Sequence, residues 1–318
     1  MTNPHLETLS VNGIRMRIAM QGAGPLVLLC HGFPELWYSW RHQIEALSSA
    51  GFRVVAPDMR GYGGTDAPLQ VEAYTRLHLI GDMVDLVRVL GERQAVIAGH
   101  DWGAIVAWGA ALTRPDLFHA VIGMSVPFAP PDPTDILKAL EDRGIHDHYL
   151  QYFQAPGVAE AELEQDTEAA IRRLLHCGSG DWHGVPAFGR LPGQGFLDHM
   201  EVPRRLPTWL TEDDISHYTG EFRRTGFRGG LNWYRTMRLS AELMAPWRGC
   251  IIRQPSLFMA GTRDSVLGFP VIPQLIAAFP KTLPGLRGCH LLNGAGHWVQ
   301  QERPEEVSAL MLDFLRAL

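Results

Sequence analysis

The sequence predicts an α/β protein with a mostly parallel central sheet, helices on both of its faces and an inserted helical domain. Apolar runs at residues 25–30, 53–56, 95–98 and 120–125 indicate buried strands, and helical patterns separate them. Strands that lack polar positions and alternate with helices are typical of a parallel sheet covered on both sides. Residues 128–247 then show helical patterns and no clear strand, before the alternation resumes at residues 256–260.

We therefore divide the chain into a core, formed by residues 1–128 and 248–318, and a helical cap domain, formed by residues 129–247. Ligands of open α/β sheets bind at the carboxyl ends of the strands, so a domain inserted there would act as a lid. A last strand is expected at residues 287–292. The expected helices cover residues 39–50, 78–90, 104–112, 159–176, 271–279 and a terminal stretch that begins at Pro304.

The composition describes an ordinary globular chain and excludes several kinds of partner. The 318 residues are 46% hydrophobic and carry a formal net charge of -6, whereas nucleic-acid binding requires a basic surface. No apolar run reaches the roughly 20 residues that span a bilayer, and residues 1–20 lack a secretory pattern. Four dispersed cysteines favour free thiols in the cytoplasm over disulfides or a zinc site. No nucleotide-binding glycine loop is recognisable, so neither a cofactor nor a metal is expected.

The segment Gly99-His100-Asp101-Trp102-Gly103 carries the strongest chemical signal, because it lies between a buried strand and a helix. Small residues allow a sharp turn there, and the central side chain projects as in the nucleophile elbow of hydrolases. That side chain is Asp101, a carboxylate that is ionised at neutral pH and attacks carbon without a base. An alkyl ester is the expected intermediate. A simple helix cap is the alternative interpretation of the segment.

Hydrolysis of such an ester requires a base, an acid that orients the base, and donors for the oxyanion. His297 lies in a glycine turn after the last expected strand, from which it would reach the elbow. Asp264 follows the strand at 256–260, and the order nucleophile, acid, histidine is that of α/β-hydrolases. The competing acid position, after the strand at 120–125, holds Ser125. The backbone N–H groups of Phe33 and Trp102 are the expected oxyanion donors.

Further motifs resemble the soluble epoxide hydrolases of the α/β-hydrolase superfamily, from about residue 22 to the end of the chain. They are residues 31–34 (HGFP), 58–63 (DMRGYG), the elbow, and two cap segments at 152–160 and 227–235. The resemblance implies that Tyr152 and Tyr234 donate hydrogen bonds to the epoxide oxygen, with Tyr149 as the nearest rival of Tyr152. A phenol suits this role, because the alkoxide left after attack is a far stronger base than phenolate. Gly230 stands where the family pattern suggests proline.

The expected function is hydrolysis of an epoxide to a vicinal diol through an ester on Asp101. A haloalkane or haloacid dehalogenase with the same nucleophile is the nearest alternative, although a halide leaves without a proton and the paired tyrosines disfavour it. A non-catalytic small-molecule receptor with this fold is a remote alternative. The partner is expected to be a small apolar epoxide, and the sequence does not indicate an oligomeric state. Expected substrate contacts are Phe33, Trp37, Trp102, Tyr152, Phe153, Tyr234 and Trp298.

Overall fold

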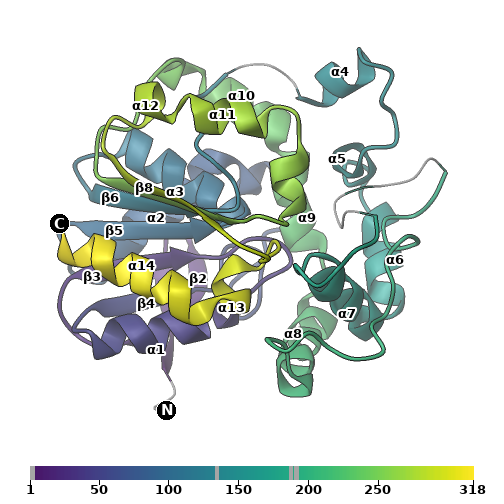
Figure 1. Ribbon diagram of the computed structural model, residues 1–318, viewed down its shortest axis with the longest axis horizontal. Coiled ribbons are helices and arrows are strands. Elements are labelled where there is room, and N and C mark those ends of the chain that lie inside the picture. The colour runs from purple at the N-terminus through teal and green to yellow at the C-terminus, as the bar shows by residue number, and fades with distance from the viewer. Residues whose placement is uncertain (1–3, 133–135, 186–188, 190–192) are drawn as a thin grey trace.

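A computed structural model describes residues 4–132, 136–185, 189 and 193–318. Eight strands form one sheet in the order β1-β2-β4-β3-β5-β6-β7-β8 (Figure 1). β2 pairs antiparallel with both β1 and β4, and every later pair in this order, from β4-β3 to β7-β8, is parallel. The predicted α/β fold with a mostly parallel sheet is confirmed. The strand bounds are β1 (His5–Val11), β2 (Ile14–Gln21), β3 (Leu26–Cys30), β4 (Arg53–Pro57), β5 (Ala95–His100), β6 (Phe118–Met124), β7 (Ser256–Gly261) and β8 (Leu286–Leu292).

Alternate residues of the central strands face two separate hydrophobic cores. Val27 and Leu29 of β3 pack with α1 (Arg41–Ser49) and α14 (Pro304–Arg316). Leu28 and Cys30 lie in the core that includes α2 (Arg76–Val89) and α3 (Trp102–Thr113). Successive side chains of a strand point to opposite faces, so a strand covered on both faces needs apolar residues at every position. Figure 1 shows the two helical layers on either side of the sheet.

The chain between β6 and β7 is helical, and Figure 1 shows its first helices gathered beyond one end of the sheet. Trp102, at the carboxyl end of β5, packs edge-to-face on Trp233 of this region, with ring centroids 6.0 Å apart. We call residues 129–247 the insertion. Its described helices are α4 (Ile136–Glu141), α5 (Tyr149–Tyr152), α6 (Val158–Gln165), α7 (Thr167–Cys177), α8 (Glu212–Thr225), α9 (Arg228–Arg235), α10 (Met237–Leu243) and η3 (Ala245–Trp247).

The predicted helix at 159–176 is in fact two helices. Asp166 separates α6 from α7 because its side chain accepts a hydrogen bond from the N–H of Ala169 (3.1 Å) and caps α7. No helix in the described ranges is long and apolar enough to cross a membrane. The short helices of the core are η1 (Trp37–Trp40), η2 (Val71–Tyr74), η4 (Ser265–Gly268), α11 (Ile272–Ala277), α12 (Phe279–Thr282) and α13 (Val299–Glu302).

The sequence analysis does not anticipate β1 and β2, which form the antiparallel edge of the sheet. Most side chains of β1 are exposed, so this strand has no apolar pattern. In β2 the arginines Arg15 and Arg17 alternate with apolar residues and pair with Asp66 and Asp58. These two ion pairs differ in burial, because Asp58 is fully buried and Arg15 is exposed.

We expect Asp58→Ala to lower the free energy of unfolding by about 3–5 kcal/mol, because a buried charge pair loses one partner. Asp58 lies 2.5 Å from Arg17 Nε, and it also accepts hydrogen bonds from the N–H groups of Trp37 (3.0 Å) and Gly64 (2.9 Å). Asp66→Ala is the matched control, since it breaks an exposed pair and should cost much less. Urea denaturation followed by circular dichroism measures both variants. Equal losses would contradict the assignment of Asp58 as a buried structural carboxylate.

Candidate active site

The nucleophile elbow predicted at Asp101 forms at the junction of β5 and α3. Asp101 has φ 53° and ψ -121°, a backbone conformation that residues other than glycine rarely adopt. A side chain at Gly103 would overlap the main-chain carbonyl of Cys30, so the turn requires glycine there. The strained turn therefore directs the Asp101 side chain away from the end of the strand. This side chain is mostly buried, with 8% of the residue exposed.

The two predicted oxyanion donors both meet the Asp101 carboxylate. The N–H of Phe33 donates to Asp101 Oδ1 at 2.9 Å, and the N–H of Trp102 donates to the same side chain. Burial raises the pKa of Asp101, while the charge of His297 and the two N–H groups act in the opposite direction. One carboxylate oxygen thus already occupies the position in which an oxyanion would develop.

His297 and Asp264 come together as predicted, on the other side of Asp101. His297 Nε2 lies 3.6 Å from Asp101 Oδ2, and its Nδ1 lies 3.1 Å from Asp264 Oδ1. Donation from Nδ1 to Asp264 leaves Nε2 directed at the nucleophile. Ser125, at the competing acid position, has its Oγ 3.0 Å from the same Nδ1. The competing acid position therefore does lie beside His297, but its residue, Ser125, carries a hydroxyl and not a carboxylate.

The electrostatics of the histidine are set by two carboxylates. Burial alone would lower the pKa of His297, but Asp264 and Asp101 outweigh this effect and raise it to about 9. Burial would raise the pKa of Asp264, and the positive charge of His297 lowers it instead. The two carboxylates therefore favour the protonated, imidazolium form of His297.

A second buried layer supports this site, and the sequence analysis gave it no role. Glu35 Oε2 lies 2.6 Å from His100 Nδ1 and accepts a hydrogen bond from the N–H of Gly32 (3.0 Å). His100 Nε2 donates to the main-chain carbonyl of His297 at 2.7 Å. Burial would raise the pKa of Glu35, but His100 lowers it to about 2. This pair links the turn that carries Phe33 to the turn that carries His297.

Two phenols from the insertion, the buried Tyr234 and the partly buried Tyr149, lie close enough to Asp101 for its charge to affect their pKa values. Burial and then the Asp101 charge raise the pKa of Tyr234 well above its usual value, and the same two causes raise that of Tyr149. Their rings contact each other edge-to-face, with centroids 6.1 Å apart. Both phenols are therefore neutral at physiological pH and can donate a proton as negative charge develops nearby.

Tyr152 lies elsewhere, which differs from the expectation. Its hydroxyl donates to Glu162 Oε2 at 2.7 Å, and the same carboxylate accepts hydrogen bonds from the N–H groups of Phe196 and Leu197. Tyr152 and Tyr149 are both partly buried, and they differ in that the Tyr152 hydroxyl serves this loop contact. Tyr149, three residues earlier on α5, is the tyrosine that lies beside Tyr234. The structure thus favours the rival that the sequence analysis named.

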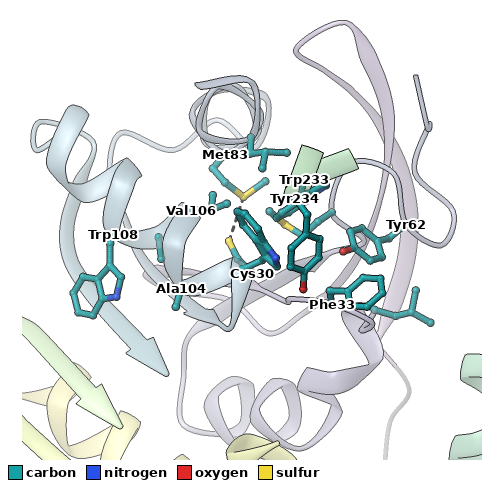
Figure 2. Packing of buried hydrophobic residues seen from close by; sticks show 14 of the residues in the cluster. Cys30, Phe33, Tyr62, Met83, Ala104, Val106, Trp108, Trp233 and Tyr234 are labelled. Carbon is teal, nitrogen blue, oxygen red and sulfur yellow. Dashed lines mark hydrogen bonds between the residues drawn. The ribbon is translucent and has the colours of Figure 1, made fainter. Parts of the chain in front are cut away.

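The expected substrate contacts divide into two groups. Phe33, Phe153 and Tyr234 form a cluster of edge-to-face rings with centroid distances of 5.0–5.9 Å. Figure 2 shows Phe33 and Tyr234 in one group with Tyr62 and Trp233. Trp102 joins the same cluster, 5.0 Å from the ring of Tyr234.

Trp37 and Trp298 lie outside this cluster. The ring of Trp37 contacts Tyr38 and His217. Trp298 packs on the His297 ring and donates its indole N–H to the carbonyl of Leu175 (2.9 Å), so it supports the histidine turn. Within the described part of the chain, no group of three or more His, Cys, Asp or Glu side chains is arranged to hold a metal ion.

We expect the raised pKa of His297 to be measurable as a loss of stability at alkaline pH. A histidine near pKa 6.5 when unfolded and about 9 when folded stabilises the fold fully below pH 6.5, and this contribution disappears as pH rises to 9. In the variant Asp264→Asn, the pKa of His297 should fall, and the stability lost between pH 6.5 and pH 9 should be smaller. NMR of labelled histidine gives the pKa, and urea denaturation at several pH values gives the stability. A His297 titration centred below pH 7 would contradict the expected charge state.

Comparison with known proteins places these features in a family. A family model described as the alpha/beta hydrolase fold matches residues 25–304. Epoxide hydrolase A of Mycobacterium tuberculosis is 44% identical over 320 residues, which cover 99% of this chain and 98% of that protein. Epoxide hydrolase 2 of Siraitia grosvenorii is 43% identical over 316 residues, which cover 97% of each chain.

A solved structure leads to the same family. The epoxide hydrolase from an endophytic Streptomyces aligns with a TM-score of 0.95 and 41% sequence identity, over 99% of this chain and 96% of that one. Identity at this level over the whole length confirms the resemblance that the motifs indicated. The chain belongs to the epoxide hydrolases of the α/β hydrolase fold.

Proposed function

We propose that the protein converts an epoxide and water to a vicinal diol through a covalent ester on Asp101. The observation that carries this proposal is the arrangement around the Asp101 carboxylate. One of its oxygens accepts the N–H of Phe33 (2.9 Å), the other lies 3.6 Å from His297 Nε2, and two neutral phenols lie nearby. Relatives that are 41–44% identical over nearly the whole chain carry the name epoxide hydrolase.

In the first step, Asp101 Oδ2 attacks a ring carbon while the carbon–oxygen bond of the epoxide breaks. The departing oxygen keeps the electron pair and takes a proton from Tyr149 or Tyr234. Tyr234 is buried and Tyr149 is partly buried, so a hydrogen bond from either phenol to the developing charge is stronger than it would be in water. This assignment replaces Tyr152 by Tyr149, because the Tyr152 hydroxyl is bound to Glu162.

In the second step, His297 Nε2 takes a proton from water, and the water oxygen attacks the ester carbonyl of Asp101. The N–H groups of Phe33 and Trp102 stabilise the negative oxygen of the tetrahedral intermediate. The bond between the carbonyl carbon and Oδ2 then breaks, and Oδ2 takes the proton from the His297 imidazolium and leaves as a hydroxyl of the diol. Asp264 orients the imidazole and stabilises the imidazolium, with a distance of 3.1 Å to Nδ1.

The charge state of His297 fits this sequence of steps. The imidazolium of the resting enzyme can return a proton to the tyrosinate that forms in the first step. Ester formation also removes the Asp101 charge, which is one of the causes that raise the His297 pKa. Both changes leave a neutral imidazole, which is the form that the second step requires.

We also propose a small apolar epoxide as the substrate and a lid role for residues 129–247. The rings that surround the phenols are aromatic hydrocarbons, namely Phe33, Phe153, Phe196 and Phe227. The insertion supplies both phenols, so it completes the site and covers the carboxyl end of β5. The four cysteines are free thiols, which fits a reducing compartment such as the cytoplasm.

The ester mechanism predicts the origin of one product oxygen. In a single turnover in labelled water, we expect the first diol to contain an unlabelled oxygen taken from Asp101, because Oδ2 leaves with the product. Mass spectrometry of the diol from styrene oxide measures the label. A fully labelled added oxygen would refute the ester, and halide release from alkyl halides without diol formation would favour a dehalogenase. Binding without turnover would favour a receptor.

We expect His297→Gln to stop the second step and leave the first. The variant should accumulate an adduct on Asp101 that equals the mass of the epoxide, because no base activates water. Intact-mass spectrometry followed by peptide mapping detects it. If no reactive epoxide gives an adduct, His297 and Asp101 do not have these roles.

The two candidate tyrosines on α5 can be separated by matched substitutions. We expect Tyr149→Phe to slow ester formation by about 100-fold or more, because a donor to the leaving oxygen is lost. Tyr152→Phe removes a hydroxyl that binds Glu162 and should leave this rate nearly unchanged. Rapid-quench measurement of the ester gives both rates. If Tyr152→Phe slows ester formation and Tyr149→Phe does not, Tyr152 is the proton donor, as the sequence first suggested.

A further inference from the structure

Glu302, at the end of α13, is a buried carboxylate to which the proposed mechanism gives no role. Its Oε2 accepts hydrogen bonds from the N–H groups of Gly180 (2.8 Å) and Gly296 (2.9 Å). Its Oε1 accepts one from the N–H of Trp298 (3.1 Å), and Ser179 Oγ lies 3.4 Å from Oε2. Donors from two distant parts of the chain therefore converge on one carboxylate.

Two of these donors flank His297 directly. Gly296 and Trp298 are its neighbours in the chain, so Glu302 fixes the main chain on both sides of the histidine. The N–H of His297 itself donates to the carbonyl of Gly178 at 2.7 Å. The histidine turn is thus held by one core carboxylate and by the segment 178–180, which follows α7 in the insertion.

The contact between the turn and the insertion is very close. A side chain at Gly296 would overlap the main chain at Gly178 and Gly180, so the two segments approach each other without intervening side chains. The indole N–H of Trp298 also binds the carbonyl of Leu175 in the last turn of α7. Segment 178–180 therefore lies directly against the turn that carries His297.

The charge of Glu302 is supported mainly by these main-chain donors. The residue is 7% exposed, and burial raises the pKa of its carboxyl while the N–H groups of Gly180, Gly296 and Trp298 lower it. Arg303 is the charged neighbour that also lowers it. A side chain with one acceptor oxygen instead of two would leave at least one buried donor without a partner.

We propose that Glu302 is a positioning residue that clamps the His297 turn to segment 178–180 of the insertion. This inference rests on the proposed function, since it assigns a way of aiming His297 at the ester of Asp101. Glu302 acts through main-chain hydrogen bonds. Its loss should therefore slow ester hydrolysis, in which His297 is the base, and spare ester formation, in which Asp101 and the phenols act.

The variant Glu302→Gln tests this proposal because it keeps the shape of the side chain and removes one acceptor oxygen. We expect hydrolysis of the ester to slow by about 10- to 100-fold, the effect of a displacement near 1 Å at a catalytic group. Ester formation should proceed at the wild-type rate. Rapid-quench mass spectrometry in single turnovers with styrene oxide measures both rates on the full chain.

Three further variants complete the experiment. Glu306→Gln removes an exposed carboxylate in the first turn of α14 and should change neither rate. Glu302→Asp keeps both acceptor oxygens and should hydrolyse the ester faster than Glu302→Gln. Gly180→Ala pushes the segment away from the carbonyl of Gly294 and should slow hydrolysis selectively without a change at Glu302. This variant also decides the matter if Glu302→Gln does not fold.

Several outcomes would overturn the proposal. Equal slowing of both steps, with a lower melting temperature, would show a merely structural carboxylate. Unchanged hydrolysis in folded Glu302→Gln, or in Gly180→Ala, would show that the clamp does not position His297. A wild-type protein that forms neither ester nor diol would instead refute the proposed function, so the two failures are distinguishable.

Discussion

The site is organised around one requirement: the buried carboxylate of Asp101 needs hydrogen-bond donors and an opposite charge beside it. An ionised carboxylate away from water is costly unless donors and opposite charge surround it. Here the N–H of Phe33 comes from the turn after β3, and the imidazole of His297 comes from the turn after β8. Both turns lie at the carboxyl ends of parallel strands, so the sheet brings together groups that are far apart in the sequence. The strained backbone of Asp101 is stable only because these partners hold its side chain.

Other buried polar residues hold the Phe33 turn and the His297 turn in place. Glu35 and His100 connect the Phe33 turn with the carbonyl of His297, and Asp264 fixes the imidazole from its far side. Each charged group of this network lies beside a group of opposite charge or beside main-chain donors, which lowers the cost of burying it. Hydrogen bonds and ion pairs therefore connect Asp101 with Glu35 and His100 beneath the two turns. A change at one member is expected to reach the others through the main chain of the two turns.

The sequence predicted those parts of the molecule that depend on local pattern and strand order. Asp101 and Asp264 each follow a strand that an apolar run marks, whereas His297 follows β8, which mixes polar and apolar residues; the structure brings the three side chains together. The edge strands β1 and β2 escaped prediction because β1 is exposed and β2 alternates apolar residues with arginines that form ion pairs. Trp37 and Trp298 were assigned to the substrate pocket because they are aromatic. Local pattern does not reveal what an aromatic ring packs against: the Trp37 ring contacts Tyr38 and His217, and the Trp298 ring packs on His297.

The tyrosines of the insertion show which part of the site cannot be predicted from local sequence pattern. Tyr234 follows Trp233, whose indole N–H binds the carbonyl of Arg60 at 3.0 Å, so its place on α9 is fixed by an anchor in the core. Tyr149 and Tyr152 are the two ends of the four-residue helix α5, and both lie on neighbouring sides of one turn. The choice between them depends on Glu162, which binds the hydroxyl of Tyr152 from another helix. A contact of this kind arises only when the helices of the insertion pack together. The motif thus identified the segment from which a tyrosine reaches Tyr234, and tertiary packing decided that this tyrosine is Tyr149.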